Sequence, residues 1–165
     1  MTKHRLLAVL ATTAFSHTAW AQAHHHGQAS ATLVLTAEGA LSLSLEIPAG
    51  DILGFERAPQ NADETELVET TIATFSDPAG LFALDGAADC QVESAAVELE
   101  TDAGHAELIA EYVYACANAA GLKTIDAEGF LRAFPGVDEV DLSALIDGKA
   151  VHVEMNQSSP LAVLR

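Results

Sequence analysis

The sequence predicts an α+β fold in which a predominantly antiparallel β-sheet carries two short helices and one disulfide. Apolar and polar residues alternate with the period of a strand over residues 31–47 and 105–116. Two separate stretches have helical spacing and helix-ending signals, at residues 61–78 and 127–136. Strands and helices segregated along the chain in this way are typical of α+β domains.

The alternation before residue 48 predicts the first two strands. Small or apolar residues at 31, 33 and 35 are followed by leucines at 41, 43 and 45. Glu38 and Gly39 lie between the two runs, which favours an antiparallel hairpin with one buried face. Pro48 ends the second strand because proline has no backbone N–H to donate to a ladder.

A loop and a helix are predicted next. Residues 48–60 contain two prolines and two glycines, so we expect an ordered loop. Asn61 is a candidate N-cap, with Glu64 three residues later as its capping-box partner. Apolar residues continue at helical spacing to Phe75, and Asp77-Pro78 ends the helix.

The second half of the chain predicts a long strand over 106–116, with Cys116 on its apolar face and Cys90 on a neighbouring strand. A short helix over 127–134 ends at Pro135-Gly136. Residues 149–155 and 161–164 are expected to form two closing strands. No repeat or domain boundary is visible, so residues 22–165 are expected to form a single domain.

The first residues predict export and a cleaved signal peptide. Lys3 and Arg5 precede an uncharged apolar stretch, and Ala19-Trp20-Ala21 offers the small residues that a signal peptidase reads. The apolar stretch is about ten residues, too short for the roughly 20 that span a bilayer. We therefore expect residues 1–21 to be removed after Ala21, or cleavage after Ala23, and the mature protein to reside in the periplasm.

Charge limits the partners of the mature chain. With residues 1–21 removed, five Lys and Arg remain against 24 Asp and Glu, a net charge of about −19. Such a chain is repelled by nucleic acid and by anionic membrane surfaces. It attracts cations or a basic partner, although solubility alone would also account for the charge.

The two cysteines, Cys90 and Cys116, have only one possible pairing. In an oxidising compartment an even number of cysteines favours a disulfide, which would stabilise the fold by roughly 3 kcal/mol. A thiolate metal site is the alternative, and it would require the pair to stay reduced.

The most unusual motif is His24-His25-His26-Gly27, just after the predicted cleavage site. Imidazoles are the commonest protein ligands of metals at neutral pH. His24 and His26 lie two residues apart at the start of a strand, so they share a face and could share an ion. The alternative is a mobile polar N-terminal tail.

Zinc needs four ligands, so further donors must come from elsewhere in the fold. His105 is the best third candidate because it opens the long strand after the predicted turn at 101–104. Another pair, His152 and Glu154, lies on the polar face of a late strand, where an ordinary solvated surface is the simpler interpretation. The carboxylates near His105 in sequence that could add oxygens are Glu98, Glu100, Asp102 and Glu107.

Copper is a separate hypothesis. Cleavage after Ala21 would start the mature chain at Gln22-Ala23-His24, placing a histidine third from a free amine. Square-planar Cu(II) takes the amine, two backbone amide nitrogens and that imidazole. Cleavage after Ala23 would make His24 the terminus, which also suits copper.

Nothing in the sequence argues for catalysis. The chain contains no G-x-S-x-G, no P-loop and no H-E-x-x-H motif. Among 24 acidic residues, neighbouring carboxylates are expected by chance and indicate no acid–base pair. We therefore expect a protein that is not an enzyme.

Taken together, the motifs resemble the ZrgA-like family of zinc-associated periplasmic proteins, formerly a domain of unknown function. The likeness covers nearly the whole mature chain. It begins with the His-x-His-Gly motif entering a strand, continues through a Pro-x-x-x-(Ile/Val)-x-Gly-Phe-Glu segment, and ends with a Tyr-x-Cys strand. The matching residues are His24, His26, Gly27, Pro48, Ile52, Gly54, Phe55, Glu56, Pro59, Cys90, His105, Tyr114 and Cys116.

Two features depart from the family pattern. The histidine usual after Gly-Phe-Glu is Arg57, which cannot bind a metal while protonated. The long His- and Asp-rich loop before His105 is reduced to the acidic stretch 98–104. The resemblance implies zinc binding, or transfer of zinc to a solute-binding protein of a zinc importer.

The first hypothesis is therefore a zinc-binding accessory protein that uses His24, His26 and His105. The alternatives are a structural or interaction module of the envelope with incidental histidines, and a copper carrier.

Overall fold

The structure, a computed structural model, describes residues 26–102 and 104–165. Over these ranges six strands form one sheet and three short strands form another. The predicted signal peptide, the possible copper terminus and the histidines at 24 and 25 lie outside the described residues.

The six-stranded sheet has the strand order β4-β5-β2-β1-β7-β8. Every neighbouring pair is antiparallel except β1 and β7, which run parallel. The predicted α+β class with a predominantly antiparallel sheet is thereby confirmed. The strands are β1 (Gln28–Leu35), β2 (Ala40–Pro48), β4 (Cys90–Asp102), β5 (His105–Cys116), β7 (Glu139–Ile146) and β8 (Lys149–Asn156).

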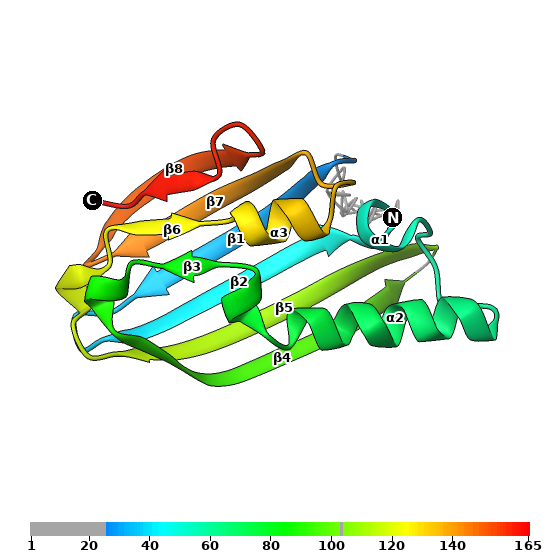
Figure 1. The fold of residues 1–165 in the computed structure, drawn as a ribbon, viewed down its shortest axis with the longest axis horizontal. Helices are drawn as coiled ribbons and strands as arrows, with labels where there is room; N and C mark the ends of the chain where they lie inside the picture. Colours follow the sequence, from blue (N-terminus) through cyan, green and yellow to red (C-terminus); the bar gives the residue numbers. More distant parts are fainter. Residues whose placement is uncertain (1–25, 103) are drawn as a thin grey trace, which may run out of the picture.

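The remaining elements cover one face of this sheet (Figure 1). They are a small sheet with the order β3-β6-β9 and the helices α1, α2 and α3. Their bounds are β3 (Ala83–Leu84), β6 (Thr124–Asp126), β9 (Leu161–Val163), α1 (Ala49–Leu53), α2 (Ala62–Phe75) and α3 (Glu128–Ala133), with single 3₁₀ turns at Pro78–Gly80, Gly86–Ala88 and Ala119–Gly121.

The core lies between the six-stranded sheet and this covering layer. Alternate residues of β1, β2, β5 and β7 point inward, as their burial patterns show. Phe75 of α2 stacks on Phe134, and Phe82 stacks on Phe130 of α3. The buried Tyr112 hydroxyl donates to the Phe75 carbonyl over 2.9 Å, which fixes the end of α2 on β5. The other residues of the strands face solvent.

The predicted loop over 48–60 contains a short helix, α1, so that prediction is wrong in part. Pro48 stands at the N-cap, and proline's fixed φ suits a helix start. Asp51 lies in the first turn, where a negative charge complements the helix dipole. Gly54 closes the helix with φ +80°, a conformation that glycine adopts readily. The described residues therefore contain three α-helices rather than two.

The predicted start of α2 is confirmed. Asn61 is the N-cap, and its side-chain Oδ1 accepts a hydrogen bond from the Glu64 N–H over 2.9 Å. The Glu64 carboxylate accepts from the Gln60 N–H over 2.7 Å, one residue before the N-cap itself.

The acidic stretch before His105 is strand rather than loop. Thr101 and Asp102, which the sequence suggested as part of a turn, are the last residues of β4, and Asp102 lies directly opposite His105. Strands β4 and β5 pair along almost their whole length.

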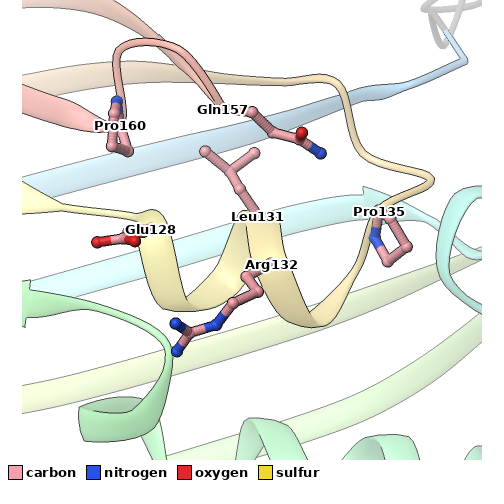
Figure 2. A pocket seen from close by; sticks show the side chains of 6 residues that line it. All are labelled: Glu128, Leu131, Arg132, Pro135, Gln157 and Pro160. Atoms are coloured by element: carbon pink, nitrogen blue, oxygen red, sulfur yellow. The ribbon is translucent and has the colours of Figure 1, made fainter.

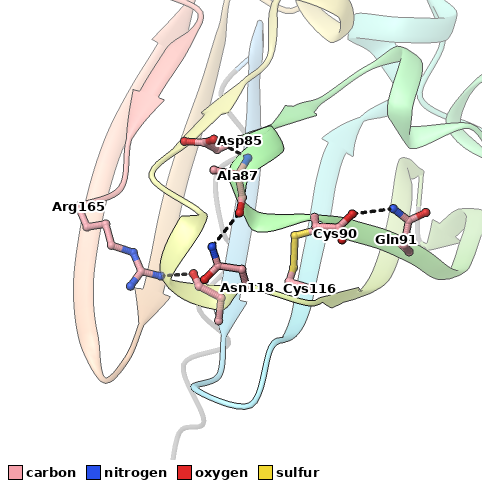
Figure 3. The surroundings of a disulfide bond; sticks show 9 residues. Asp85, Ala87, Cys90, Gln91, Cys116, Asn118 and Arg165 are labelled. Carbon is pink, nitrogen blue, oxygen red and sulfur yellow. Dashed lines mark hydrogen bonds between the residues drawn. A yellow bond between two sulfur atoms is a disulfide. The ribbon is translucent and has the colours of Figure 1, made fainter.

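The predicted disulfide joins Cys90 and Cys116. The two residues are directly opposite each other on β4 and β5 (Figure 3). Beside them, the Asn118 side-chain amide donates to the Ala87 carbonyl over 2.9 Å, which connects the 3₁₀ turn at Gly86–Ala88 to the one at Ala119–Gly121. The disulfide thus fixes one end of the β4–β5 hairpin, and His105 lies at the other end.

Candidate functional site

Glu56 lies between two histidines that are far apart in the sequence. Its Oε1 is 3.6 Å from His26 Nδ1, and its Oε2 is 3.9 Å from His105 Nδ1. His26 lies two residues before the start of β1, His105 is the first residue of β5, and Glu56 follows α1. The sheet order, in which β2 separates β1 from β5, brings both imidazoles to one end of the sheet.

Asp51 adds a second carboxylate on the side of His26. Its Oδ1 is 3.8 Å from His26 Nδ1, and its Oδ2 accepts a hydrogen bond from the Gly27 N–H over 2.8 Å. The Asp51 side chain is only 8% exposed, whereas the His26 imidazole is 79% exposed. One oxygen of Asp51 is therefore fixed by the backbone while the other faces an accessible imidazole.

Helix α1 is what brings these carboxylates to the histidines. Asp51 lies in its first turn, and Gly54 reverses the chain so that Glu56 returns toward the helix. A Cβ on Gly50 would lie 2.9 Å from Glu56 Oε1, so the absence of a side chain at position 50 lets Glu56 approach.

The nitrogen–oxygen distances are longer than those of a direct hydrogen bond. At 3.6–3.9 Å they exceed the 2.7–3.2 Å of an N–H···O bond. Two bonds of about 2.0–2.1 Å that meet at a tetrahedral zinc span about 3.3 Å. A small movement of exposed side chains would therefore place an imidazole nitrogen and a carboxylate oxygen at zinc-binding separation.

The described part of the chain forms an open arrangement rather than a closed metal site. Within residues 26–102 and 104–165, no group of three His, Cys, Asp or Glu side chains is placed to hold a metal ion. His24 lies outside these ranges, so the predicted trio of His24, His26 and His105 stays a prediction.

Sequence reasoning missed Asp51 and Glu56. It favoured the carboxylates near His105 in sequence, of which Asp102 lies opposite His105 on β4. Both missed residues belong to the segment that was expected to be a loop. Glu56 stands in the Gly-Phe-Glu motif, which was the available signal.

Arg57 follows Glu56 in the sequence, but its guanidinium binds Glu64 at the start of α2. Its guanidinium donates to both oxygens of Glu64, over 2.7 and 3.0 Å, and lies 5.1 Å from the Phe55 ring centroid. These hydrogen bonds raise the pKa of Arg57 and lower the pKa of Glu64 to about 2. Arg57 therefore supports the start of α2.

More carboxylates lie on the other side of His26. A depression of about 380 Å³ is lined by His26, Gly27, Gln28, Asp138 and Glu139. Gly27 has φ +79°, and its carbonyl accepts hydrogen bonds from the N–H groups of Asp138 and Glu139. The four carboxylates near this exposed imidazole, those of Asp51, Glu56, Asp138 and Glu139, favour cations over anions at this end of the sheet.

A different pocket lies beside α3, with a volume of about 360 Å³. In Figure 2 the Leu131 side chain points toward Gln157 and Pro160, and Arg132 extends from the opposite side of the helix. Glu128 and Arg132 bring opposite charges and the lining contains no histidine or cysteine, so this pocket does not suit a metal ion.

No helix in the described ranges is both long and apolar enough to cross a membrane.

The model of the family described as "ZrgA family zinc uptake protein" matches residues 23–164. A search of curated proteins finds no match to this chain. The matched region contains every residue of the arrangement around Glu56.

Proposed function

The chain belongs to the ZrgA family of zinc uptake proteins, and from that premise we propose that it is a non-catalytic zinc-binding accessory protein of the periplasm. It holds Zn(II) between His26 and His105, with Glu56 and Asp51 supplying oxygens, and passes the ion to a zinc uptake system. Zinc is the cargo of the protein rather than a cofactor of a reaction.

The observation that supports this proposal most strongly is the position of Glu56. One carboxylate faces the imidazoles of residues 26 and 105, which are far apart in the sequence but lie at the same end of the six-stranded sheet. Nitrogen and oxygen donors in this combination are the ligands that zinc takes in sites that keep an open position. An exposed, incompletely closed site also suits an ion that must be released again.

His24 is proposed as a further protein donor, in addition to His26, His105, Glu56 and Asp51. It lies two residues before His26, on the segment that leads into β1. Its imidazole would complete a ligand set that the described residues leave open.

The proposed periplasmic location is supported by the disulfide, which persists in oxidising compartments. It is also supported by the leader-like first 21 residues of the sequence. The net negative charge would raise the local concentration of cations near the site. The partner is proposed to be the solute-binding protein of a zinc importer, on the basis of the family alone.

The test is a zinc titration of the correctly processed protein against a competing chelator. His26→Ala, His105→Ala and Glu56→Gln are each expected to weaken the tightest zinc site by about 100-fold or more. The reason is that even groups that only support a metal ligand are worth about 10- to 100-fold in affinity.

Glu69→Gln is the matched control, because Glu69 is an exposed carboxylate on α2, an element that carries none of the proposed ligands. It should leave the affinity unchanged. Zinc affinity that is equal in the wild type and in all three site variants would favour an envelope module with incidental histidines. Tight Cu(II) binding that disappears when the mature N-terminus is extended would favour the copper carrier.

A further inference from the structure

A second histidine–carboxylate pair lies on the solvent-facing side of the six-stranded sheet. His152 of β8 has its Nδ1 3.2 Å from Asp141 Oδ1 of β7. The His152 side chain is 59% exposed, and Asp141 is 33% exposed. Neither residue of this pair belongs to α1, to β5 or to the loop that carries Glu56.

The strand register explains why these side chains meet. His152 is directly opposite Ser143, and Glu154 is directly opposite Asp141. His152 and Glu154 are two residues apart, so they project from the same face as Asp141. Directly opposite residues have Cβ atoms about 5 Å apart, which brings the Glu154 carboxylate within reach of the same space.

The distance between His152 and Asp141 differs in kind from those around Glu56. At 3.2 Å it falls at the upper limit of an N–H···O hydrogen bond. With the proton on Nδ1, the imidazole turns this nitrogen toward Asp141 and keeps the Nε2 lone pair for another ligand. A carboxylate on one ring nitrogen orients the imidazole and raises its basicity, which is how most metal-binding histidines are supported.

We propose that His152, oriented by Asp141, binds a second divalent metal ion through Nε2, with Glu154 and water as the other ligands. The expected cation is zinc or another divalent transition-metal ion, because the donors are an imidazole and a carboxylate. With two protein ligands, the site binds more weakly than the site proposed around Glu56. Its existence does not depend on that first site.

The position of the second site suggests what it does. Asp141 lies two residues from Glu139 on the same face of β7, about 7 Å along the strand. Glu139 lines the depression that also contains His26. An ion held weakly at His152 is therefore stored on the same acidic surface from which His26 is reached.

The test uses the processed full-length mature protein and follows the histidine ring nitrogens by NMR during titration with Zn(II) alone. Before zinc is added, His152 should carry its proton on Nδ1. The His152 Nε2 signal should then move only after the first equivalent of zinc has bound. Asp141→Asn should weaken this second event by about tenfold or more.

Two variants distinguish this inference from the proposed function. His152→Ala should abolish the second event and leave the first unchanged, and Ser143→Ala, the residue opposite His152, should change neither. The double variant His26→Ala/His105→Ala should lose the first event and keep the second. A His152 ring that is unaffected by several equivalents of zinc, or equal zinc stoichiometry in His152→Ala and wild type, would overturn the inference.

Discussion

Gly27 is the residue on which the geometry of the site depends most. Its N–H donates to Asp51, and its carbonyl accepts from Asp138 and Glu139, so it links α1 to the start of β7. Its φ of +79° is unfavourable for a residue with a side chain. A Cβ at this position would lie 2.8 Å from Asp138 Oδ2. Both the conformation and the close approach of Asp138 require glycine.

We therefore expect Gly27→Ala to destabilise the protein and to weaken zinc binding. The left-handed conformation alone costs an alanine roughly 1–2 kcal/mol, and the contact with Asp138 adds to it. Urea denaturation measures the first effect and a chelator competition the second.

Gly148→Ala is the matched control. Gly148 has nearly the same φ, +77°, but a Cβ there would meet nothing within 4 Å. It should show only the conformational part of the loss and normal zinc affinity. Equal losses of stability in the two variants would show that the contact with Asp138 contributes nothing.

The metal-binding candidates illustrate how far single residues can be predicted. The histidines at 26 and 105 were predictable because imidazoles beside predicted strands are conspicuous in an acidic chain. The roles of Asp51 and Glu56 were not predictable from composition, since 24 acidic residues offer many equivalent choices. Asp51 and Glu56 reach the histidines because the short helix α1 follows β2 directly and the chain reverses at Gly54.

At the scale of elements, the start of α2 is held by a bidentate ion pair. Arg57 and Glu64 hydrogen-bond to each other through both carboxylate oxygens, and Glu64 also accepts from the Gln60 N–H. These contacts connect the segment that carries Glu56 to the first turn of α2. The pair therefore connects the segment that carries Glu56 to the helix.

The pair predicts a specific pH dependence of stability. The pKa of Glu64 falls from 4.5 to about 2 in the folded protein, mainly because its carboxylate accepts hydrogen bonds from Arg57. The native state thus binds fewer protons at this group than the unfolded state, so stability increases with pH across this window. The contribution is fully present above about pH 4.5 and is lost as the pH falls toward about 2.

We expect Glu64→Gln to be less stable than the wild type at neutral pH. The difference between the two proteins should shrink as the pH falls through this window, because protonated Glu64 resembles glutamine. Thermal unfolding followed by circular dichroism between pH 2 and pH 7 measures it, with Glu69→Gln as the control. A difference that is constant with pH would contradict the role assigned to the ion pair.

The elements were predicted unevenly, for physical reasons. The hairpin of β1 and β2 and the long strand β5 have strict alternation, and α2 has a clear N-cap, so these were predicted. Strand β7 was missed although Val140, Leu142 and Ala144 alternate with polar residues. In the small sheet, β9 was predicted as the closing strand over 161–164, whereas β3 and β6, with two and three residues, are too short to show a period.

At the scale of the whole molecule, one side of the six-stranded sheet is packed and the other faces solvent. The packed side buries the core under the helices and the small sheet (Figure 1). The disulfide fixes one end of the β4–β5 hairpin, and His105 stands at the other. The topology thus separates the part of the fold that provides stability from the end that carries the histidines and carboxylates.

The parallel pairing of β1 with β7 could not be predicted from the sequence. It joins residues 28–35 to residues 139–146, with more than 100 residues between them. Local patterns do not specify such a distant partner. This pairing places Asp138 and Glu139 beside His26, so the acidic surroundings of the site are a property of the complete fold.

The central claim is that zinc binds where His26, Glu56 and His105 meet. Anomalous diffraction at the zinc absorption edge, from crystals of the mature protein loaded with one equivalent of Zn(II), tests it most directly. The account predicts that the strongest anomalous peak lies between the two imidazoles and within bonding distance of a Glu56 oxygen. A strongest peak at any other place, with no density between His26 and His105, would contradict it.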